Sequence, residues 1–414
     1  MTAAPLTIAG PSLADVEAAR LIVGRVAEVT PMETSRYLSD VLGAPVHLKC
    51  ENLQRTGSYK IRGAYNRMSR LSDEEKARGV VAASAGNHAQ GVAFAARELG
   101  IQATIFMPIG VALPKLQATR HYGAEVVLRG HTVSEPLKAA QEFAERTGAV
   151  YIPPFDHADV VAGQGTLGLE LLEQVPELET VIVPIGGGGL ISGVASVLKR
   201  RAAELGRSIR VIGVQAANAA AYPVSLAAGV VTEITISPTI ADGIAVAKPG
   251  KLNFEIVRDA VDEVVTVDDD DIARAMLVLL ERAKMVVEPA GAVGVAAIMT
   301  GKITASGPTV VVLSGGNIDP LIMERVIAHG LAASERYLKL RIPLPDRPGQ
   351  LARTSEIIAD QNANVVEVLH TRHGSGLAIS QVELELHIET RGPEHAEQVI
   401  GALREAGYDP RTTL

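Results

Sequence analysis

Lys60 stands in a segment of small residues that is unusual for a surface lysine. The segment reads GSYKIRGA, with Gly57 and Ser58 before the lysine and Gly63 after it. Such residues indicate a tight backbone that another part of the chain approaches closely. An amine held there is suited to form a Schiff base with a carbonyl compound. Taken alone, Lys60 is more simply an ordinary solvated lysine, so its interpretation depends on the other motifs.

Four consecutive glycines, Gly186, Gly187, Gly188 and Gly189, precede Leu190. The flanking runs TVIVPI and LISGVASVLKRRAAE predict a turn from a parallel strand into a helix. N–H groups at such a turn converge on one point, and the helix dipole adds partial positive charge there, so the turn suits a phosphate. The spacing matches neither GxGxxG nor a GK[ST] loop, and the regular flanks disfavour a merely flexible segment.

An earlier motif, SAGNHAQG, repeats this design with Ser84, Ala85, Gly86, Asn87 and His88 between a predicted strand and a predicted helix. Free N–H groups at the turn suit a substrate carboxylate, and the Asn87 amide suits a ring hydroxyl or its oxyanion. The alternative for Asn87 is a helix N-cap that needs no ligand. We assign no proton transfer to His88.

Ser314 ends the run TVVVLSGGN, at the carboxyl end of a predicted strand, where open α/β sheets bind ligands. A hydroxyl that faces a pyridine nitrogen leaves this nitrogen largely unprotonated, because serine cannot stabilise a pyridinium as a carboxylate does. Such a ring favours prompt expulsion of a group from Cβ. An amine, two anion-binding turns and a neutral hydroxyl are together the parts needed to hold and use pyridoxal phosphate.

The composition excludes several other classes of protein. The 414 residues carry a net charge of −8, which gives no attraction to nucleic acid or to anionic membranes. No apolar run reaches the length of a spanning helix, and the start MTAAPLTIAG lacks a basic region followed by an apolar one, so we expect a cytoplasmic protein. Cys50 is the single cysteine and is expected to fill apolar space, and no Cys and His cluster suggests zinc.

Alternating short β-branched runs and helical stretches fill residues 80–325, which predicts an α/β fold. We expect two open, mostly parallel sheets with helices on both faces and a cleft between them. The predicted catalytic domain spans 1–330, with a small subdomain at about 45–150 inserted in the large one. The helix expected from Asp269, DDDDIARAMLVLLERAKM, begins with acids that favour its dipole; a metal site there is the weaker interpretation.

The pattern changes near residue 335, where a second domain is expected over 336–414. Strands and helices follow in the order βαββαβ, which is the ferredoxin-like arrangement. The segment contains no plausible catalytic set, so it is expected to be a separate module.

With these motifs in view, residues 15–325 resemble the threonine dehydratases (threonine ammonia-lyases) of the fold type II pyridoxal-phosphate enzymes, the tryptophan synthase β superfamily. The ordered motifs ENLQRTGSYKIRGA, SAGNHAQG, GGGGL, VEPAGAVG and LSGGN carry this resemblance. The C-terminal segment, with DRPGQLA at its first turn, resembles an ACT domain, a regulatory module that binds amino acids. The pairing is similar to that of medium-length dehydratases with a single ACT domain.

The resemblance implies a role for each motif. Lys60 would form the Schiff base and act as the base at Cα, Tyr59 would lie against the ring, Asn87 would contact the ring hydroxyl and Ser314 would face the ring nitrogen. The phosphate would lie at Gly186 to Leu190, and the substrate carboxylate at Ser84 to His88. The implied reaction converts L-threonine, and L-serine more weakly, to a 2-oxo acid and ammonia.

Two departures from relatives bear on the activity. Serine racemases of this superfamily have a serine acid at the position of Ala85, so racemisation would lack its second proton donor. They also bind a divalent cation through two carboxylates where this chain has Gln215 and Ala221, so no divalent metal is expected. A monovalent ion held by carbonyls stays open.

Several functions remain open at this stage. Within the superfamily they are 3-hydroxyaspartate ammonia-lyase, serine or threonine racemase and sulfhydrylase, with side-chain selection expected in SPTIADGIAV, residues 237–246. A non-catalytic amino-acid sensor is the alternative outside the superfamily. For regulation, the resemblance implies that isoleucine or valine binds near Asp346 to Leu351, although Gly349 there equally serves a turn. A homo-oligomer is expected, in a role in isoleucine biosynthesis.

Overall fold

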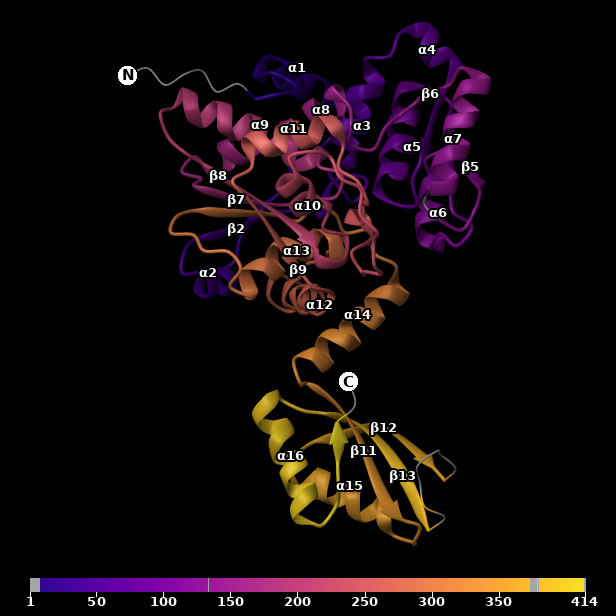
Figure 1. Ribbon diagram of the computed structural model, residues 1–414, viewed down its shortest axis with the longest axis vertical. Helices are drawn as coiled ribbons and strands as arrows, with labels where there is room; N and C mark the ends of the chain where they lie inside the picture. The colour runs from indigo at the N-terminus through magenta and orange to yellow at the C-terminus, as the bar shows by residue number, and fades with distance from the viewer. Residues whose placement is uncertain (1–7, 133, 373–377, 379, 413–414) are drawn as a thin grey trace. The chain divides into compact units, whose positions relative to one another are not determined.

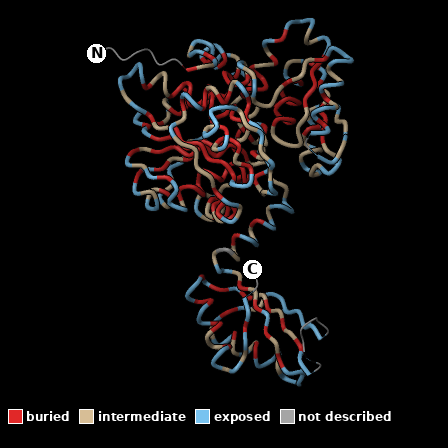
Figure 2. The backbone as a smooth tube through the Cα atoms, viewed as in Figure 1, coloured by how far each residue is buried: buried red, intermediate tan, exposed pale blue. Residues whose placement is uncertain are grey.

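The computed structural model describes residues 8–132, 134–372, 378 and 380–412 (Figure 1). The chain divides into two compact units, Met1–Pro320 and Leu321–Leu414. Each unit has its own hydrophobic core, as the buried segments show in Figure 2. The expectation of a cytoplasmic protein depends partly on the start of the chain. Residues 1–7 of that start lie outside the described part.

A six-stranded sheet forms the centre of the first unit, in the order β1-β2-β10-β7-β8-β9. Neighbouring strands are parallel from β2 to β9, and β1 is antiparallel to β2. The central strands are buried along their whole length, which explains why their sequences are continuous apolar runs. The strands are β1 (Met32–Thr34), β2 (Val46–Lys49), β7 (Thr180–Pro184), β8 (Arg210–Ala216), β9 (Glu263–Val267) and β10 (Thr309–Val312).

Helices cover both faces of this sheet (Figure 1). One layer contains α1 (Leu13–Val23), α8 (Ala158–Gln174), α9 (Gly189–Glu204) and α11 (Lys251–Ala260). The other contains α2 (Arg36–Leu42), α12 (Asp269–Val278) and α13 (Pro289–Met299). Between these elements lie α10 (Ala221–Ala228) and the 3₁₀ turns η1 (Glu51–Leu53), η2 (Ala217–Ala219) and η3 (Asp242–Ile244).

A second sheet of four parallel strands, in the order β5-β4-β3-β6, forms a smaller layer of the same unit. Its strands are β3 (Val80–Ala83), β4 (Ala103–Met107), β5 (Glu125–Leu128) and β6 (Val150–Tyr151). The associated helices are α3 (Lys60–Ser69), α4 (Asp73–Arg78), α5 (Asn87–Leu99), α6 (Leu113–His121) and α7 (Ser134–Thr147). The prediction of two mostly parallel sheets with helices on both faces is confirmed.

Two details differ from the expectations. The inserted segment is expected from about residue 45, but β2 (Val46–Lys49) pairs with β10 in the larger sheet, a contact that no local pattern reveals. The helix expected through Met285 is α12 only as far as Val278, after which Leu279–Ala283 forms a π-helical turn. Asp268 caps α12 by accepting from the N–H of Asp271, so this acid serves the helix start.

The second unit has a four-stranded antiparallel sheet in the order β12-β13-β11-β14. Along the chain its elements follow the predicted order βαββαβ, preceded by α14 (Pro320–Ala333). Alternate residues of β11 and β13 are buried against two helices, as expected for a sheet with one covered face. The elements are β11 (Tyr337–Pro345), α15 (Gln350–Asp360), β12 (Asn364–Thr371), β13 (Gln381–Glu389), α16 (Pro393–Glu405) and β14 (Arg411–Thr412). Residues 377 and 379, which precede β13, lie outside the described residues.

Candidate active site

Lys60 is the first residue of α3 and is half-buried. Its Nζ donates to the carbonyl of Pro154 at 3.2 Å and lies 5.3 Å from the centre of the Tyr59 ring. Burial lowers the pKa of Lys60 to about 8, although the negative charge of Glu288 opposes this shift. The amine is therefore far easier to deprotonate than that of an ordinary lysine.

A buried cluster of four charges anchors the helix that Lys60 begins. Arg62 donates to Glu51 at 2.8 Å and to Glu170 at 2.6 Å, and Lys49 lies 2.7 Å from Glu170. Two cations match two carboxylates, and Thr30 donates to Glu51 at 2.6 Å. A buried charge that loses its partner is strongly destabilising, so this cluster fixes α3 against η1 and α8.

Glycines bring the backbones of α3, α5 and α8 into close contact. A Cβ on Gly163 of α8 would lie 2.5 Å from the carbonyl oxygen of Arg62, and one on Gly91 of α5 would lie 3.2 Å from the carbonyl carbon of Lys60. A Cβ on Gly63 would lie 2.4 Å from the amide of Gln164. The close approach predicted for the backbone around Lys60 is therefore present.

The four-glycine run forms the turn from β7 into α9, as the sequence predicts. The helix begins at Gly189, and Gly188 precedes it with φ 100°, a left-handed conformation that favours glycine. The carbonyl of Gly187 accepts from the hydroxyl of Tyr222 and from the amide of Asn253, both at 3.1 Å. With its carbonyl held this way, the turn leaves N–H groups at the helix start for an anion.

This turn is closely packed on one side. A Cβ on Gly187 would lie 2.3 Å from the Phe155 ring, and one on Gly188 would lie 1.9 Å from the Tyr222 hydroxyl. A Cβ on Gly189 would also press on Phe155, at 2.9 Å. Side chains at these positions have no room, so the shape of the turn is set by its surroundings as well as by its own backbone.

The second turn, between β3 and α5, holds the residues Ser84, Ala85 and Gly86. The Ser84 hydroxyl accepts from the N–H of Gly86 at 3.2 Å. Among the described residues, only the amine of Lys115 comes within 4 Å of a Cβ built on Gly86, at 3.9 Å, so this turn has open space beside it. It has the N–H donors of a helix start and room for a small anion.

Asn87 is the first helical residue of α5 and is not its N-cap, a place taken by Gly86. The alternative that its side chain only caps the helix is therefore wrong. Its Nδ2 donates to Oε1 of Glu288 at 2.7 Å, and its Oδ1 accepts from Nδ2 of Asn317 at 2.8 Å. These contacts fix the direction of the amide and leave one Nδ2 hydrogen for another acceptor.

Glu288 is a buried carboxyl at the start of α13, 4% exposed. Burial raises its pKa to about 7; Asp242 adds to the shift, and Lys115, Asn87 and Lys60 oppose it. A group that titrates near neutrality and contacts Asn87 is a marker of a functional site. Glu288 lies in the motif VEPAGAVG, but its pairing with a residue 201 positions away gives no signal in the sequence.

Ser314 and Tyr59 meet through the backbone, since the N–H of Tyr59 donates to the Ser314 carbonyl at 3.2 Å. Ser314 is 3% exposed and follows β10. The nearby Ser58 hydroxyl is buried and has no hydrogen-bond partner among the described residues. His88 is also buried: its Nε2 lies 2.9 Å from the carbonyl of Ile152, and burial lowers its pKa to about 3. A neutral, backbone-bound His88 is consistent with a structural role and gives no reason to assign it proton transfer.

The segment expected to lack a divalent metal has an amide in place of a carboxylate. Gln215 is buried, its Nε2 donating to the carbonyl of Ile185 at 3.3 Å and its Oε1 accepting from the N–H of Tyr222 at 2.9 Å. Within residues 8–132, 134–372, 378 and 380–412, no group of three or more His, Cys, Asp or Glu side chains is arranged to hold a metal ion.

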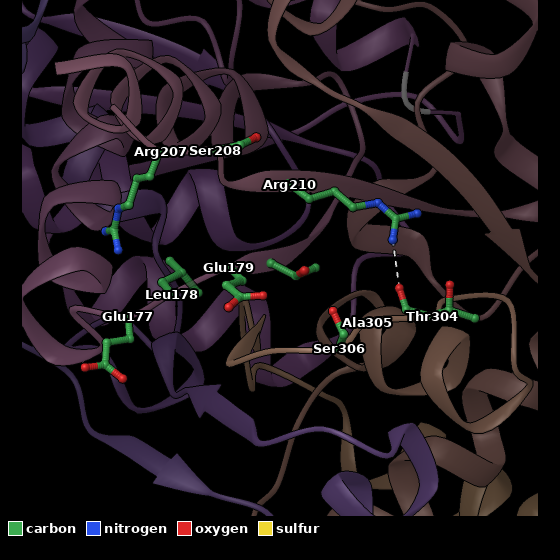
Figure 3. Close-up of a pocket in the computed structure, with 10 residues that line it drawn as sticks. Glu177, Leu178, Glu179, Arg207, Ser208, Arg210, Thr304, Ala305 and Ser306 are labelled. Carbon is green, nitrogen blue, oxygen red and sulfur yellow. Dashed lines mark hydrogen bonds between the residues drawn. The ribbon is translucent and has the colours of Figure 1, made fainter. Parts of the chain in front are cut away.

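An open hollow of about 890 Å³ lies beside the amino ends of β7 and β8, and Figure 3 shows the residues that line it. Its lining includes Glu177, Glu179 and Arg207, and Arg210 donates to the carbonyl of Thr304 at 2.7 Å. The hollow is wide and polar, and it lies at the amino end of β7 and β8. In open α/β sheets ligands bind at the carboxyl ends, so we place the site at the other edge.

Comparison with known families agrees with this geometry. The model of the pyridoxal-phosphate dependent enzymes matches residues 25–315, which includes Lys60, both turns and Ser314. This chain belongs to that family. The ACT domain model matches residues 340–407, inside the second compact unit. The resemblance predicted from the motifs is confirmed, and so is the cofactor of the family, pyridoxal phosphate.

Individual relatives within the pyridoxal-phosphate family are similar along most of their length. A protein of Geobacter sulfurreducens named L-threonine ammonia-lyase is 48% identical over 92% of this chain and 94% of its own. A protein of Thermotoga maritima with the same name is 47% identical over 97% and 99%. Among solved structures, the processed form of threonine deaminase isoform 2 from Solanum lycopersicum has a TM-score of 0.72 at 38% identity and covers 78% of this chain and 91% of that one. Maize serine racemase also has a TM-score of 0.72, at 36% identity, over 78% and 98%.

No helix in the described part of the chain is long and apolar enough to cross a membrane.

Proposed function

We propose that this chain is a threonine ammonia-lyase that uses pyridoxal phosphate to convert L-threonine to 2-oxobutanoate and ammonia, with L-serine as a poorer substrate. The observation that carries the proposal is the Lys60 amine, which has a lowered pKa and stands in one unit with the two glycine turns. Relatives named for this activity cover nearly the whole chain.

The residues fit the cofactor. Gly186, Gly187, Gly188, Gly189 and Leu190 would hold the phosphate, because the first four leave their N–H groups uncovered by side chains at the start of α9. Lys60 would carry the covalent bond, with Tyr59 against the ring. Asn87 and Ser314 are buried or half-buried polar groups suited to the ring hydroxyl and nitrogen. Bound in this way, the cofactor supplies an electron sink that makes the substrate Cα–H acidic.

Lys60 has two roles in this proposal. Its Nζ would bind the cofactor covalently and, as a free amine, would take the proton from Cα of the substrate. A pKa near 8 suits a base that works near neutral pH, because about a tenth of the amine is unprotonated at pH 7, against less than about a thousandth of an ordinary lysine. Loss of the β-hydroxyl as water, followed by uptake of water and release of ammonia, balances the reaction.

The turn from Ser84 to His88 would bind the substrate carboxylate through N–H groups at the start of α5. Ala85 stands where serine racemases of this superfamily have a serine acid, so the chain lacks that second proton donor, which favours elimination over racemisation. A racemase is therefore a weaker candidate, although maize serine racemase shares the fold. The remaining candidates are a 3-hydroxyaspartate ammonia-lyase, a sulfhydrylase and a non-catalytic amino-acid sensor.

A substrate panel tests the proposal. We expect the purified protein to form 2-oxobutanoate fastest from L-threonine, to form pyruvate more slowly from L-serine, and to lose both activities in K60A. Release of oxaloacetate from 3-hydroxyaspartate, or D-serine from L-serine, at a higher kcat/KM would favour a different activity of the same family. Binding of amino acids without any turnover would favour a sensor.

For regulation, we propose that the ACT domain binds isoleucine or valine near Asp346 to Leu351. Gly349 has φ 90°, and a Cβ there would meet nothing within 4 Å among the described residues, so the turn depends on glycine and has space beside it in the described part of the chain. We also propose that the catalytic domain ends near residue 330 and that the second domain begins near residue 336. We further propose that the protein is a cytoplasmic homo-oligomer that acts in isoleucine biosynthesis. Titration of isoleucine into the full chain and into a chain ending near residue 335 tests it: we expect inhibition of the first alone.

A further inference from the structure

Lys115 of α6 forms an ion pair that joins the region of the small sheet to that of the large one. Its Nζ lies 2.8 Å from Oδ2 of Asp242 in η3. The Lys115 side chain is only 16% exposed, whereas that of Asp242 is 65% exposed. A lysine side chain that is mostly covered is thus paired with an aspartate side chain that is mostly in water.

The position of the Lys115 amine relates it to the turn before α5. Its Nζ is the atom nearest to a Cβ built on Gly86, at 3.9 Å, so it faces this turn. The charges of Lys115 and Asp242 also act on Glu288, which holds the Asn87 amide. The ion pair therefore lies beside the turn that we assign to the substrate carboxylate.

We propose that Lys115 is a substrate-binding residue whose ammonium contacts the carboxylate of the amino acid held at the Ser84 to His88 turn. This inference rests on the proposed function. A helix start offers only partial charge, whereas Lys115 adds a full charge and a charge-assisted hydrogen bond. Lys115 thereby selects amino acids over amines that lack the carboxylate.

Asp242 competes with the substrate for this ammonium. Because its side chain is mostly in water, its pairing with Lys115 has little net strength and is readily exchanged. The Lys115 side chain is already mostly covered, so little further burial of this side chain is required when a carboxylate enters. Asp242 is thus a weak competitor for the Lys115 ammonium.

Steady-state kinetics on the holoenzyme separate this role from a structural one. For K115Q we expect KM for L-threonine to rise about 10- to 100-fold, the range for loss of a charged hydrogen bond, with kcat within about threefold of wild type. For D242N we expect KM to be unchanged or lower, because the competitor is removed. If the pair only held the two regions together, both variants would raise KM and lower kcat alike, and the proposal would be overturned.

Binding probes keep this test independent of turnover. L-alanine has the carboxylate but no β-leaving group, and 1-amino-2-propanol is threonine without its carboxylate. Titrating each into the cofactor-loaded enzyme, with the visible absorbance as readout, should show that K115Q weakens L-alanine about 10-fold or more and leaves the amino alcohol unchanged. Equal weakening of both ligands, or of neither, would overturn the proposal, even in a protein that fails to deaminate threonine.

The matched control is K138Q on α7, which removes an exposed lysine paired with Glu142 at 3.9 Å. We expect no change in KM or in either titration for this variant. A shift as large as that of K115Q would show that any lost surface charge acts in this way, and would contradict a specific contact.

Discussion

The turns that lead into α9 and α5 both follow a parallel strand, yet the space around their glycines differs. At Gly187 and Gly188, added Cβ atoms would lie 2.3 Å and 1.9 Å from the side chains of Phe155 and Tyr222. At Gly86 the nearest atom to such a Cβ is the flexible end of Lys115, at 3.9 Å. The turn before α9 is closely packed and suits a group that stays bound. The turn before α5 has room for a group that enters and leaves.

The largest effect is expected from G188A in the closely packed turn before α9. The new methyl would face the Tyr222 hydroxyl at a residue with φ 100°, so the turn must shift or Tyr222 must move. We expect the affinity for pyridoxal phosphate, measured by titration of the apoprotein, to fall about 100-fold or more, since strain at such a position costs about 1–3 kcal/mol before the clash is counted.

Gly123 provides the control for backbone strain. It has φ 90° but nothing within 4 Å of an added Cβ, so G123A introduces the strain without the clash. We expect this variant to lose some thermal stability and to keep its cofactor affinity. Equal losses of affinity in both variants would show that packing around the glycine turn is unimportant.

The pH dependence of cofactor capture tests the environment of Lys60. Burial lowers the pKa of Lys60 to about 8, so the neutral amine predominates above this pH. We expect the rate at which the apoprotein captures pyridoxal phosphate to rise about 10-fold per pH unit up to pH 8 and to level off above it. Stopped-flow absorbance measures this rate, and a rise that continues beyond pH 10 would indicate an ordinary lysine.

Glu288 should give the pH profile of kcat/KM a titration near pH 7. Burial raises its pKa to about 7, so the carboxylate that holds Asn87 forms as the pH rises through this value. We expect kcat/KM for threonine to increase through about pH 7, and E288Q to lack this limb and to stay about 3- to 10-fold below the wild-type plateau. His88 adds no limb near pH 6.5, because burial lowers its pKa to about 3.

A control for E288Q is E142Q, at an exposed glutamate of α7. Its pH profile should match that of the wild type. A limb near pH 7 that survives in E288Q would assign the titration to another group.

The smallest effect is expected from G86A in the open turn. Among the described residues the methyl would meet only the Lys115 amine, at an ordinary contact distance. We expect unchanged cofactor affinity and stability, with KM for threonine raised by about 2- to 5-fold as the methyl takes space beside the carboxylate. G110A, at another open glycine, should leave KM unchanged. Loss of cofactor from G86A would remove the distinction between the two turns.

The sequence predicted the parts of the site that are local in the chain. Strand, glycine turn and helix follow one another within about twenty residues, so the turn before α9 and the Lys60 segment were visible as patterns. The packing of Phe155 on Gly187 was not predicted, because contacts between distant segments have no local signature. The pairing of β2 with β10 was also not predicted, because the two strands are far apart in the chain.

The charged pairs that the sequence did not indicate are formed by residues far apart in the chain. Arg62 and Glu170 are 108 positions apart, and Lys115 and Asp242 are 127 apart. A charged residue in a sequence is ordinarily interpreted as solvated, and only the fold shows that a distant partner allows it to be buried. Asn317 ends the motif LSGGN and Glu288 lies in VEPAGAVG, but neither motif indicates that its residue contacts Asn87.

The most direct test of the account is to find which atom carries the cofactor. Borohydride reduction of the purified holoenzyme, followed by proteolysis and mass spectrometry, fixes the pyridoxyl group where it is attached. We predict a single modified lysine, Lys60, and no modification in K60A. A pyridoxyl group on another lysine, or none on a protein that still deaminates threonine, would contradict the account.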